Sequence, residues 1–473
     1  MNKKDVIIVG AGPSGIFTAY ELLQLNNNLK ITIIEKGKPI EKRNCPINKI
    51  GKCIQCKPCC NITCGFAGAG AFSDAKLSLY DKDSEEVLVG GNLPTIIGNQ
   101  ETKNLIDYCD KIYLQFGADP KIEGIENKNE ILEIKNKAKE NNINLIDTPI
   151  RHLGTEKSRE LYYKLEQYLI SNKVEIKYEY EVTKLLITNN EITGVFIENI
   201  KDKNKKEILY SDKVVLAVGR VGSGRLFKMC EINGIKTNIG TVDIGIRYEM
   251  KTEKGIEDIN RLMYEGKFIY NTKLFNDKVR TFCQNPGGYV TQEVYNSNLS
   301  LANGHSFKEK KSENTNLAIL SSHNFTEPFK DPIGFGKRIG KTTNMLGDGA
   351  IIVQRFGDLL KGKRTWDKDL KNNSVIPTLK GIQAGDLSLA FPYRTLSNII
   401  DFIQQMDKVV PGFANEDNLM YGPEIKFYSN AIELDKNLMT NIKGLYAIGD
   451  GAGLTRGLMM ASCSGVYLAR KLI

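Results

Sequence analysis

A glycine-rich turn near the start of the chain constrains the fold more than any other feature. Val6 to Val9 is an apolar run, and Gly10-Ala11-Gly12-Pro13-Ser14-Gly15 follows it at once. A helical pattern then runs from about Ile16 to Leu25, and a second apolar run, Ile31 to Ile34, ends in Glu35. This order of strand, glycine turn, helix, strand and acid predicts a dinucleotide-binding unit with a parallel sheet.

Each part of this segment has a physical task. Gly10 permits the tight turn, Gly12 lets the backbone approach a pyrophosphate, and Gly15 lets the helix pack against the strand. The helix N-terminus offers free N–H groups and the positive end of its dipole to phosphate. Glu35 lies twenty residues after Gly15, where a carboxylate can accept hydrogen bonds from ribose hydroxyls.

Composition narrows the class of protein. The chain has 473 residues and a formal net charge of +9, enough length for two or three domains. Its basic residues are scattered, and the lysine-rich stretch 201–206 reads as a solvated turn, so no nucleic-acid partner is predicted. No run reaches about 18 uninterrupted apolar residues, so no membrane partner is predicted either. We expect a cytoplasmic protein.

The pattern along the chain predicts a discontinuous nucleotide-binding domain. Val182 to Thr188 and Ile192 to Ile197 read as strands of a meander, and Val214 to Val218 as a buried parallel strand ending at Gly219. Near the end, Leu445 to Ile448 reads as a strand and Gly457 to Leu472 as a helix. The glycine-rich pieces at both ends must therefore meet, with the middle of the chain inserted between them.

These pieces, in this order, resemble the FAD-binding domain of the glutathione-reductase-like flavoproteins. Over nearly the whole chain the sequence also resembles a family of bacterial FAD-dependent dehydrogenases of largely unassigned substrate. The stretches that carry this second resemblance are Cys64 to Asp74, His152 to Thr155, Phe282 to Gly288 and Tyr421 to Ser429. Ala67 and Ala75 stand where that family pattern has glycine.

The resemblance implies an α/β fold in which a Rossmann-type FAD-binding domain carries an inserted α+β substrate domain. The expected segments are 1–83 with a cysteine-rich loop, a mostly helical insertion at 84–150, the meander at 151–237, the substrate domain at 238–412, and a last FAD-binding segment at 413–473.

The resemblance also implies which residues hold FAD. Asp450 is expected at the ribityl or pyrophosphate region, and the helix near Arg456 and Gly457 at the flavin pyrimidine edge, where its dipole stabilises negative charge. The full set of expected FAD residues is Gly10, Gly12, Pro13, Ser14, Gly15, Glu35, Lys36, Arg43, Gly70, Ala71, Ser73, Val182, Gly219, Gly449, Asp450, Arg456 and Gly457.

The segment Gly219 to Gly224 invites a second nucleotide-site interpretation. It follows a strand, but no later strand ends in an acid at a convincing distance. We therefore interpret it as a strand-end loop of the FAD domain and predict no dedicated NAD(P) domain. NAD(P)H, or a donor such as a ferredoxin, remains open as a transient source of electrons.

A cluster of cysteines follows the second strand. Cys45, Cys53, Cys56, Cys59, Cys60 and Cys64 lie within twenty residues, at a spacing near that of bacterial ferredoxins. Three interpretations stay open: an iron–sulfur cluster such as [4Fe-4S], a zinc or purely structural thiol site, or a redox-active disulfide. By resemblance to this superfamily, the segment reaches toward the flavin ring.

Candidate catalytic residues fall in the presumed substrate region. His305 is the first proton-donor candidate, Cys283 lies just before a Pro-Gly-Gly turn, and Tyr289 is a candidate phenolic acid. Arg247 and Arg394 are candidates to clamp a carboxylate. Structural roles explain each of these residues as well.

Together these features predict an FAD-dependent oxidoreductase. We expect a hydride to pass between flavin N5 and a small organic substrate, with reduction of an activated C=C bond as the favoured reaction and an iron–sulfur cluster as the electron relay. The alternatives are a thiol–disulfide oxidoreductase using the cysteines at 53–64, a tRNA-modifying flavoprotein and a redox sensor.

Overall fold

The computed structural model describes most of the chain, in two compact units. The described residues are 3–45, 56, 59–72, 75–82, 84–238, 240–253, 255–263, 266–295, 299–305, 310–326, 328–329, 331–427 and 431–473. Unit 1 contains residues 1–123, 149–238 and 429–473, and unit 2 contains residues 124–148 and 239–428.

Unit 1 is built on a five-stranded parallel sheet in the order β22-β10-β1-β2-β6. These strands are β1 (Val6–Val9), β2 (Ile31–Glu35), β6 (Glu175–Tyr178), β10 (Val214–Leu216) and β22 (Leu445–Ala447). Every residue of β1 and β2 is buried, as expected for strands covered on both faces. The predicted strands at both ends of the chain therefore do meet, because β22 pairs with β10 and β10 with β1.

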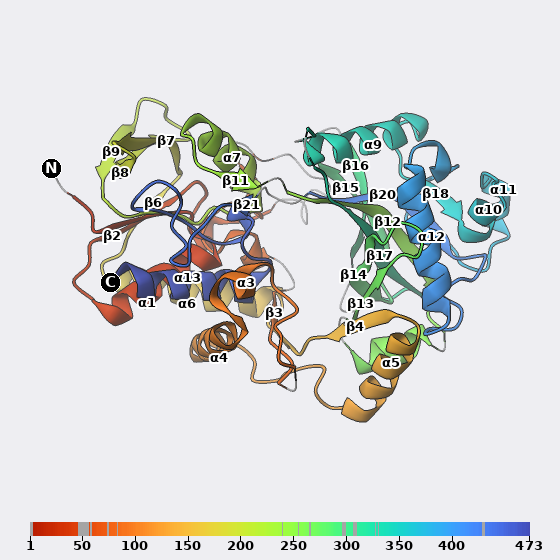
Figure 1. Cartoon of the computed structure of the whole chain (residues 1–473). Helices are drawn as coiled ribbons and strands as arrows, with labels where there is room; N and C mark the ends of the chain where they lie inside the picture. Colours follow the sequence, from red (N-terminus) through yellow and green to blue (C-terminus); the bar gives the residue numbers. More distant parts are fainter. Residues whose placement is uncertain are drawn as a thin grey trace. The chain divides into compact units, whose positions relative to one another are not determined.

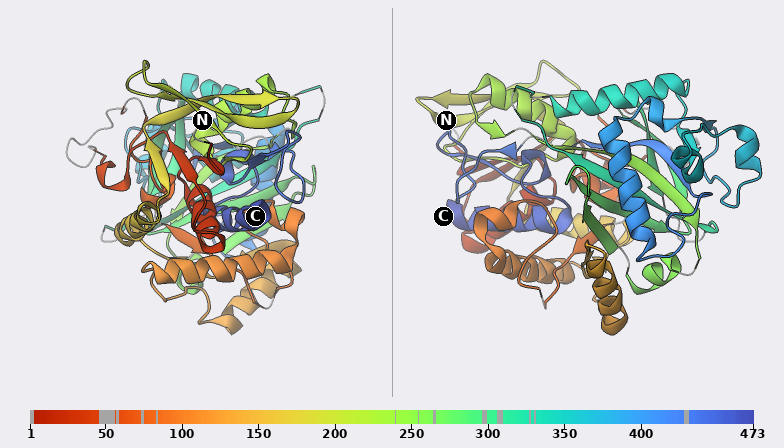
Figure 2. Two further views of the ribbon diagram at one scale, coloured as in Figure 1. Left: turned by 90° about the vertical axis from the view of Figure 1, so that its left-hand side faces the viewer. Right: turned by 45° about the vertical axis from the view of Figure 1, so that its right-hand side comes forward.

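Helices and a small antiparallel sheet complete unit 1. α1 (Pro13–Leu25) and α13 (Leu458–Leu472) lie side by side (Figures 1 and 2). The predicted meander is confirmed as β7 (Tyr180–Thr188), β8 (Glu191–Asn199) and β9 (Lys206–Tyr210). The other elements are η1 (Ile40–Lys42), η2 (Gly68–Phe72), β3 (Lys76–Ser78), α3 (Leu93–Ile97), α4 (Asn99–Gln115), β5 (Ile150–His152), α6 (Thr155–Ser171), η3 (Arg220–Gly222), α7 (Ser223–Ile232), β11 (Thr237–Asn238), β21 (Ala431–Ile432) and η5 (Asp450–Ala452).

Unit 2 is built on an eight-stranded sheet in the order β19-β18-β20-β12-β17-β14-β13-β4. The strands are β4 (Ile143–Asp147), β12 (Val242–Lys251), β13 (Gly266–Asn271), β14 (Lys278–Pro286), β17 (Asn314–His323), β18 (Ile352–Arg355), β19 (Gln383–Ala384) and β20 (Leu419–Phe427). All neighbours are antiparallel except β18 and β19.

Helices and one hairpin surround this sheet. The hairpin is β15 (Tyr289–Tyr295) with β16 (Leu299–His305). α12 (Tyr393–Asp407) crosses in front of the sheet in Figure 1 and buries Phe402 against Tyr270 of β13. The remaining elements are α5 (Lys128–Glu140), α8 (Ile256–Leu262), α9 (Pro332–Leu346), α10 (Phe356–Leu360), α11 (Asp367–Lys371) and η4 (Leu387–Leu389).

The two faces of β12 differ in chemistry although both are buried. Ile244, Ile246 and Tyr248 belong to the apolar core of the unit, and the Tyr248 ring lies 5.4 Å from that of Phe413. The opposite face carries Asp243, Arg247 and Glu249, each less than 3% exposed. A buried sheet face with three charged side chains is unusual, because each charge must find a partner.

The structure divides the chain differently from the sequence prediction in two places. The predicted boundary at residue 412 falls too early, because β20 lies inside the sheet of unit 2. The predicted helical insertion at 84–150 is not one body, since α4 packs in unit 1 and α5 in unit 2. Local patterning could not show either, because both depend on pairing between distant segments.

Candidate functional site

The carboxyl ends of the parallel strands in unit 1 bring the predicted glycine turns together. Gly10 has φ +111°, and a Cβ there would lie 2.6 Å from the carbonyl oxygen of Ala217, just after β10. A Cβ at Gly15 would lie 2.1 Å from the Gly10 oxygen, so helix α1 can pack on its own turn only through glycine. Ligands of open α/β sheets bind at this edge.

Between these tight contacts the turn leaves room for a ligand. A Cβ at Gly12 would meet nothing within 4 Å, and neither would one at Gly457, which precedes α13. No side chain of the described residues caps α1 or α13, so their first-turn N–H groups are free to bind an anion. Two free helix N-termini beside an open glycine turn fit the pyrophosphate and flavin ends of FAD.

Glu35 connects the glycine turn after β1 to Gly65, which follows the last cysteine of the cluster, through hydrogen bonds. Its carboxylate accepts hydrogen bonds from the N–H groups of Ala11 (2.8 Å), Gly37 (2.7 Å) and Gly65 (2.9 Å). A carboxylate offers about four lone-pair sites, so acceptor capacity remains for a ribose hydroxyl. Glu35 is therefore an organiser of the loop as well as a predicted ribose ligand.

Asp450 is held at the other side of the same edge. Its carboxylate accepts from the Thr455 hydroxyl (2.8 Å) and from the Gly457 N–H (3.3 Å), and Arg220 Nε lies 3.7 Å away. Burial raises the pKa of Asp450, and the Arg220 charge opposes that shift. Thr455 and Arg220 are functional candidates that sequence reasoning missed, since only their position in space beside Asp450 marks them.

Arg43 organises the cysteine-rich loop. Its buried guanidinium donates to the carbonyl oxygens of Asn61 (3.0 Å), Ile62 (2.6 Å) and Phe66. It also stacks on the ring of Phe72 at 4.6 Å. Burial lowers the pKa of Arg43 to about 10. Contact between Arg43 and FAD stays a prediction. In the structure the guanidinium nitrogens of Arg43 donate to backbone oxygens of the loop.

Two cysteines of the cluster form a thiol pair. The thiols of Cys59 and Cys64 are hydrogen-bonded to each other, and donation by Cys59 lowers the pKa of Cys64 to about 7 while the pKa of Cys59 rises. Cys45, Cys56 and Cys60 are also free thiols, and Cys53 lies outside the described residues. Among described residues no three His, Cys, Asp or Glu side chains are placed to hold a metal ion.

The remaining predicted FAD residues lie around this edge or beside it. Pro13 and Ser14 open α1, and Ser14 Oγ would lie 2.7 Å from a Cβ at Gly449. A Cβ at Gly70 would touch Leu458, the first residue of α13. Lys36 pairs with Glu181 at 3.0 Å.

The last predicted FAD residues are Val182, Gly219, Arg456, Ala71 and Ser73. Val182 is buried in β7, Gly219 precedes η3, and the Arg456 N–H donates to the Gly90 oxygen at 2.8 Å. Ala71 lies in η2, and Ser73 is outside the described residues. Contact with FAD stays a prediction for all of these residues.

All five predicted catalytic residues lie in unit 2, and four of them come from strands around Arg247. Arg247 Nη2 donates to the Cys283 carbonyl oxygen at 2.6 Å, and a Cβ at Gly304 would lie 1.9 Å from the same nitrogen. His305 follows Gly304 and stands directly opposite Tyr289 in the hairpin. These residues come from β12, β14, β15 and β16, which the sequence alone did not bring together.

Arg394 does not join this group. It lies in the first turn of α12 and forms a two-point ion pair with Asp277, at 2.6 and 2.7 Å. That contact lowers the pKa of Asp277. The structure therefore shows an ion pair for Arg394, and a clamp on a substrate carboxylate stays a prediction.

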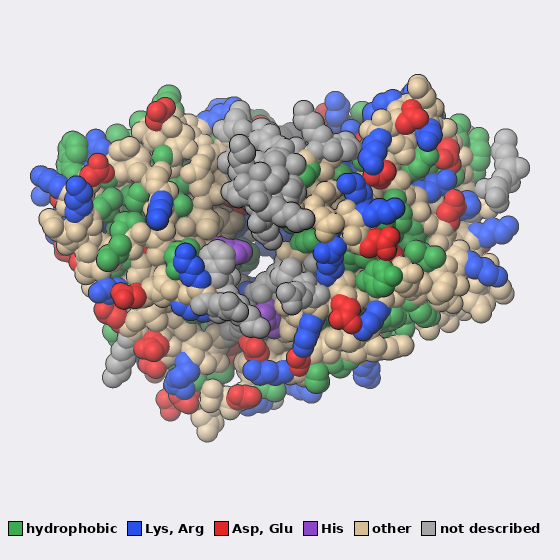
Figure 3. All heavy atoms as spheres, turned by 180° about the vertical axis from the view of Figure 1, so that it is seen from behind, with side chains coloured by type: hydrophobic (Ala, Val, Ile, Leu, Met, Phe, Trp, Pro, Cys, Tyr) green, Lys and Arg blue, Asp and Glu red, His purple; other side chains and the backbone are tan. Residues whose placement is uncertain are grey.

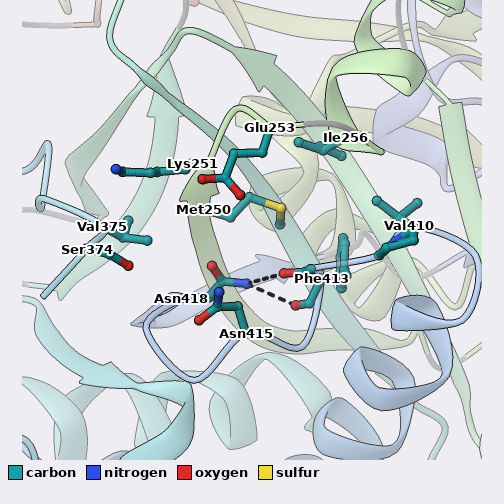
Figure 4. Close-up of a pocket in the computed structure, with 12 residues that line it drawn as sticks. Met250, Lys251, Glu253, Ile256, Ser374, Val375, Val410, Phe413, Asn415 and Asn418 are labelled. Carbon is teal, nitrogen blue, oxygen red and sulfur yellow. Dashed lines mark hydrogen bonds between the residues drawn. The ribbon is translucent and has the colours of Figure 1, made fainter.

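Two cavities are lined by residues outside the Arg247 group. One, with a volume of about 30 Å³, is lined by Met250, Glu253 and Asn418 among others (Figure 4). The side-chain amide of Asn418 donates to the carbonyl oxygens of Gly412 and Phe413. This cavity has room for only a water-sized molecule. A second, of about 360 Å³ in unit 1, is lined by Asn92, Asn238, Glu433 and the loop Ala452 to Leu454.

Comparison with known proteins supports a flavoprotein. A model described as an FAD binding domain matches residues 147–298, and one described as an FAD-dependent protein, C-terminal domain-like, matches residues 245–426. An uncharacterized protein of Clostridium beijerinckii is 24% identical over 492 residues, which span 100% of this chain and 81% of that protein.

Two solved structures show what the chain is similar to. E. coli quinol fumarate reductase FrdA is 14% identical at a TM-score of 0.45, over 99% of this chain and 70% of that one. Glycine oxidase from Bacillus cereus is 13% identical at 0.36, over 99% and 95%.

The two FAD-related family models support an FAD-dependent oxidoreductase. On the face shown in Figure 3, basic side chains are interspersed with acidic ones rather than gathered into a stripe. None of the helices in the described ranges has both the length and the hydropathy needed to span a bilayer.

Proposed function

We propose that unit 1 binds FAD and that unit 2 binds a small organic molecule which exchanges a hydride with it. Bound FAD supplies hydride exchange at its N5 atom. The observation that carries the proposal is the open turn at Gly12 beside two uncapped helix N-termini, at one edge of a parallel sheet. This strand order and the antiparallel meander support a glutathione-reductase-like FAD domain and the family of bacterial FAD-dependent dehydrogenases.

The chain's own residues have distinct tasks in this proposal. The first turn of α1 binds the pyrophosphate, and Glu35 accepts from the adenosine ribose while holding the turn. The first turn of α13 favours negative charge at the flavin pyrimidine edge. In unit 2, Arg247 binds the substrate, Cys283 fixes the Arg247 side chain through its carbonyl oxygen, and His305 or Tyr289 moves the substrate proton.

Reduction of an activated C=C bond, or its reverse, is the reaction we assign first. FAD-loaded protein is reduced without oxygen, using dithionite, NADH, NADPH or a reduced ferredoxin in turn, and then mixed with a panel of activated alkenes. We expect at least one alkene to reoxidise the flavin faster than buffer does. If no alkene does so, the C=C assignment fails; if dithionite cannot bleach the flavin, the whole proposal fails.

The cysteine segment needs a separate test. The described cysteines do not form a three-ligand group, so we derive no electron path through an iron–sulfur cluster. Iron, acid-labile sulfide and zinc are measured on protein purified without oxygen. Iron with sulfide would support the predicted [4Fe-4S] relay, zinc would support a structural site, and absence of all three would remove both.

One observation favours a second candidate function, thiol–disulfide exchange. The Cys59–Cys64 pair has the hydrogen-bonded geometry and lowered Cys64 pKa of a reactive dithiol. If this function holds, two thiols disappear for each flavin reduced, and Cys64→Ser stops that loss. Equal flavin reduction in Cys64→Ser and in unmodified protein would exclude it.

A further inference from the structure

The polar face of β12 in unit 2 and the side chains that pack on it form a buried cluster of charged and polar groups. This cluster, called the seam below, contains Asp243, Arg247, Glu249, Arg280, Asn316, Glu424 and Lys426. Arg247 is fully buried, and its Nε donates to Asn316 Oδ1 of β17 at 2.7 Å. On the other side, Arg247 Nη1 lies 3.6 Å from Glu424 of β20, which is equally buried. Lys426 and Cys283 are only partly buried, so the seam reaches solvent at one end.

Four atoms in this seam lack hydrogen-bond partners among the described residues. Arg247 Nη1 and Asn316 Nδ2 are unused donors, and both carboxylate oxygens of Glu424 are unused acceptors. Lys426 Nζ lies 2.9 Å from Glu424 Oε1, but without hydrogen-bonding geometry. Buried polar atoms nearly always make a hydrogen bond, so four atoms that make none within one cluster point to a bound group.

The backbone around Arg247 departs from regular strand geometry on both sides. The β12–β20 register shifts between Gly245 and Arg247, and the β14–β17 register shifts between Phe282 and Asn285. Cys283, inside the second shift, has φ +50°, a left-handed conformation that strains a residue other than glycine. Bulges and strained residues gather at functional sites because they re-aim side chains.

The charges of the seam select the kind of ligand. Arg280 pairs with Asp243, and Lys426 pairs with Glu424. Arg247 also faces Glu424 at 3.6 Å, so the seam holds three basic side chains and three acidic ones, whose formal charges cancel: Arg247, Arg280 and Lys426 against Asp243, Glu249 and Glu424. A ligand of net charge zero therefore fits better than a simple anion, provided that it offers acceptors to the unused donors and donors to Glu424.

We propose that Arg247, Asn316 and Glu424 form a binding site for a free amino acid. The ligand carboxylate accepts from Arg247 Nη1 and Asn316 Nδ2, and the ligand ammonium group donates to Glu424. This inference concerns binding alone and does not make the amino acid the substrate of the C=C reaction proposed above. Binding itself is separate from flavin reduction.

The test measures binding by calorimetry on the FAD-loaded full chain. The probes are the proteinogenic L-amino acids, each retained one being compared with its des-amino carboxylate and its decarboxylated amine. We expect at least one amino acid to bind and both partial analogues to bind at least about 10-fold more weakly, because each leaves charged groups unpaired. This comparison needs no variant, so misfolding cannot obscure it.

A matched pair of variants locates the site. Glu424→Gln should weaken amino-acid binding about 10-fold or more and leave the des-amino carboxylate unaffected. Glu416→Gln makes the same chemical change in an exposed ion pair of unit 2 and should change neither. If no amino acid binds, or if the des-amino carboxylate binds equally well, the seam is a structural ion-pair network and the proposal is wrong. A flavin that still reduces normally in that case leaves the proposed function standing.

Discussion

At the scale of single residues, some glycines of unit 1 are required for packing and others only leave room for a ligand. Gly15 is required for packing, because a Cβ would lie 2.1 Å from a carbonyl oxygen. Gly12 is not required for packing, because a Cβ there meets nothing within 4 Å and its φ is −78°. Any constraint on Gly12 therefore comes from a ligand.

We predict that Gly12→Ala folds normally but binds FAD more weakly. The added methyl group would stand where the pyrophosphate must approach the backbone, so the Kd should rise at least about tenfold, or about 1.4 kcal/mol. The measurement is FAD titration into apoprotein, followed by flavin fluorescence. Gly224→Ala in α7, where a Cβ also meets nothing, is the control and should leave the Kd unchanged. An unchanged Kd in Gly12→Ala would place the pyrophosphate elsewhere.

Ala67 is a second residue-scale test. It stands where the resembling family has glycine, and the structure keeps the left-handed backbone there, with φ +70°. That conformation costs alanine about 1–2 kcal/mol, whereas glycine loses about 0.4–1 kcal/mol through unfolded-chain entropy. Ala67→Gly should therefore raise the free energy of unfolding by up to about 1 kcal/mol in urea titrations. A clear loss of stability would show that the alanine methyl group contributes more packing than the strain costs.

At the scale of elements, α1 and α13 must approach closely to set both helix N-termini at the FAD site. Gly465 in α13 makes this approach possible, since a Cβ there would lie 2.3 Å from the Ser14 oxygen. Gly465→Ala should lower the free energy of unfolding by about 1–3 kcal/mol and weaken FAD binding as well. Thermal unfolding with and without FAD measures both effects. Stability equal to that of Gly224→Ala would contradict the close packing.

The contact between β17 and α12 predicts a pH dependence of stability. His323 Nε2 lies 3.0 Å from the Thr395 hydroxyl, and burial lowers the pKa of His323. The unfolded chain takes up a proton below about pH 6.5, before the folded chain does, so stability falls as pH drops through that range.

The matching variant is His323→Gln, which keeps a hydrogen-bonding side chain but cannot titrate. Between about pH 7.5 and about pH 5.5, wild type should lose about 1 kcal/mol more than His323→Gln in urea titrations. Above about pH 7.5 the variant should show no further difference in slope. Parallel losses in the two proteins would mean that His323 titrates alike in folded and unfolded chains.

Sequence patterning predicted the elements of unit 1 well. The expected first strand, helix and second strand match β1, α1 and β2, because burial, glycine geometry and helix periodicity are all local there. Unit 2 was harder to predict, because its strands pair across long stretches of chain. Apolar and polar residues alternate along β12, a pattern that from sequence alone is typical of a strand with one face in solvent. Only the structure shows that the polar face is buried, because the β15–β16 hairpin covers Arg247.

At the scale of the whole molecule, the FAD site and the Arg247 site differ in the same way: local patterns predict the first, and only long-range strand pairing forms the second. The turns of the FAD site could be predicted because each is a compact motif that ends a strand. Asn316 and Glu424 could not, since only the order β20-β12-β17 places them on either side of Arg247. Glu424 lies in a stretch that carries the family resemblance, but nothing local gives it a partner.

The proposed oxidoreductase function requires that the full chain holds FAD in unit 1. The most direct measurement is the visible spectrum of the purified full chain, with the flavin released by denaturation and counted per chain. We predict an oxidised-flavin spectrum, bleached by dithionite, with one FAD per chain after reconstitution. A colourless protein that takes up no FAD on reconstitution would contradict the account.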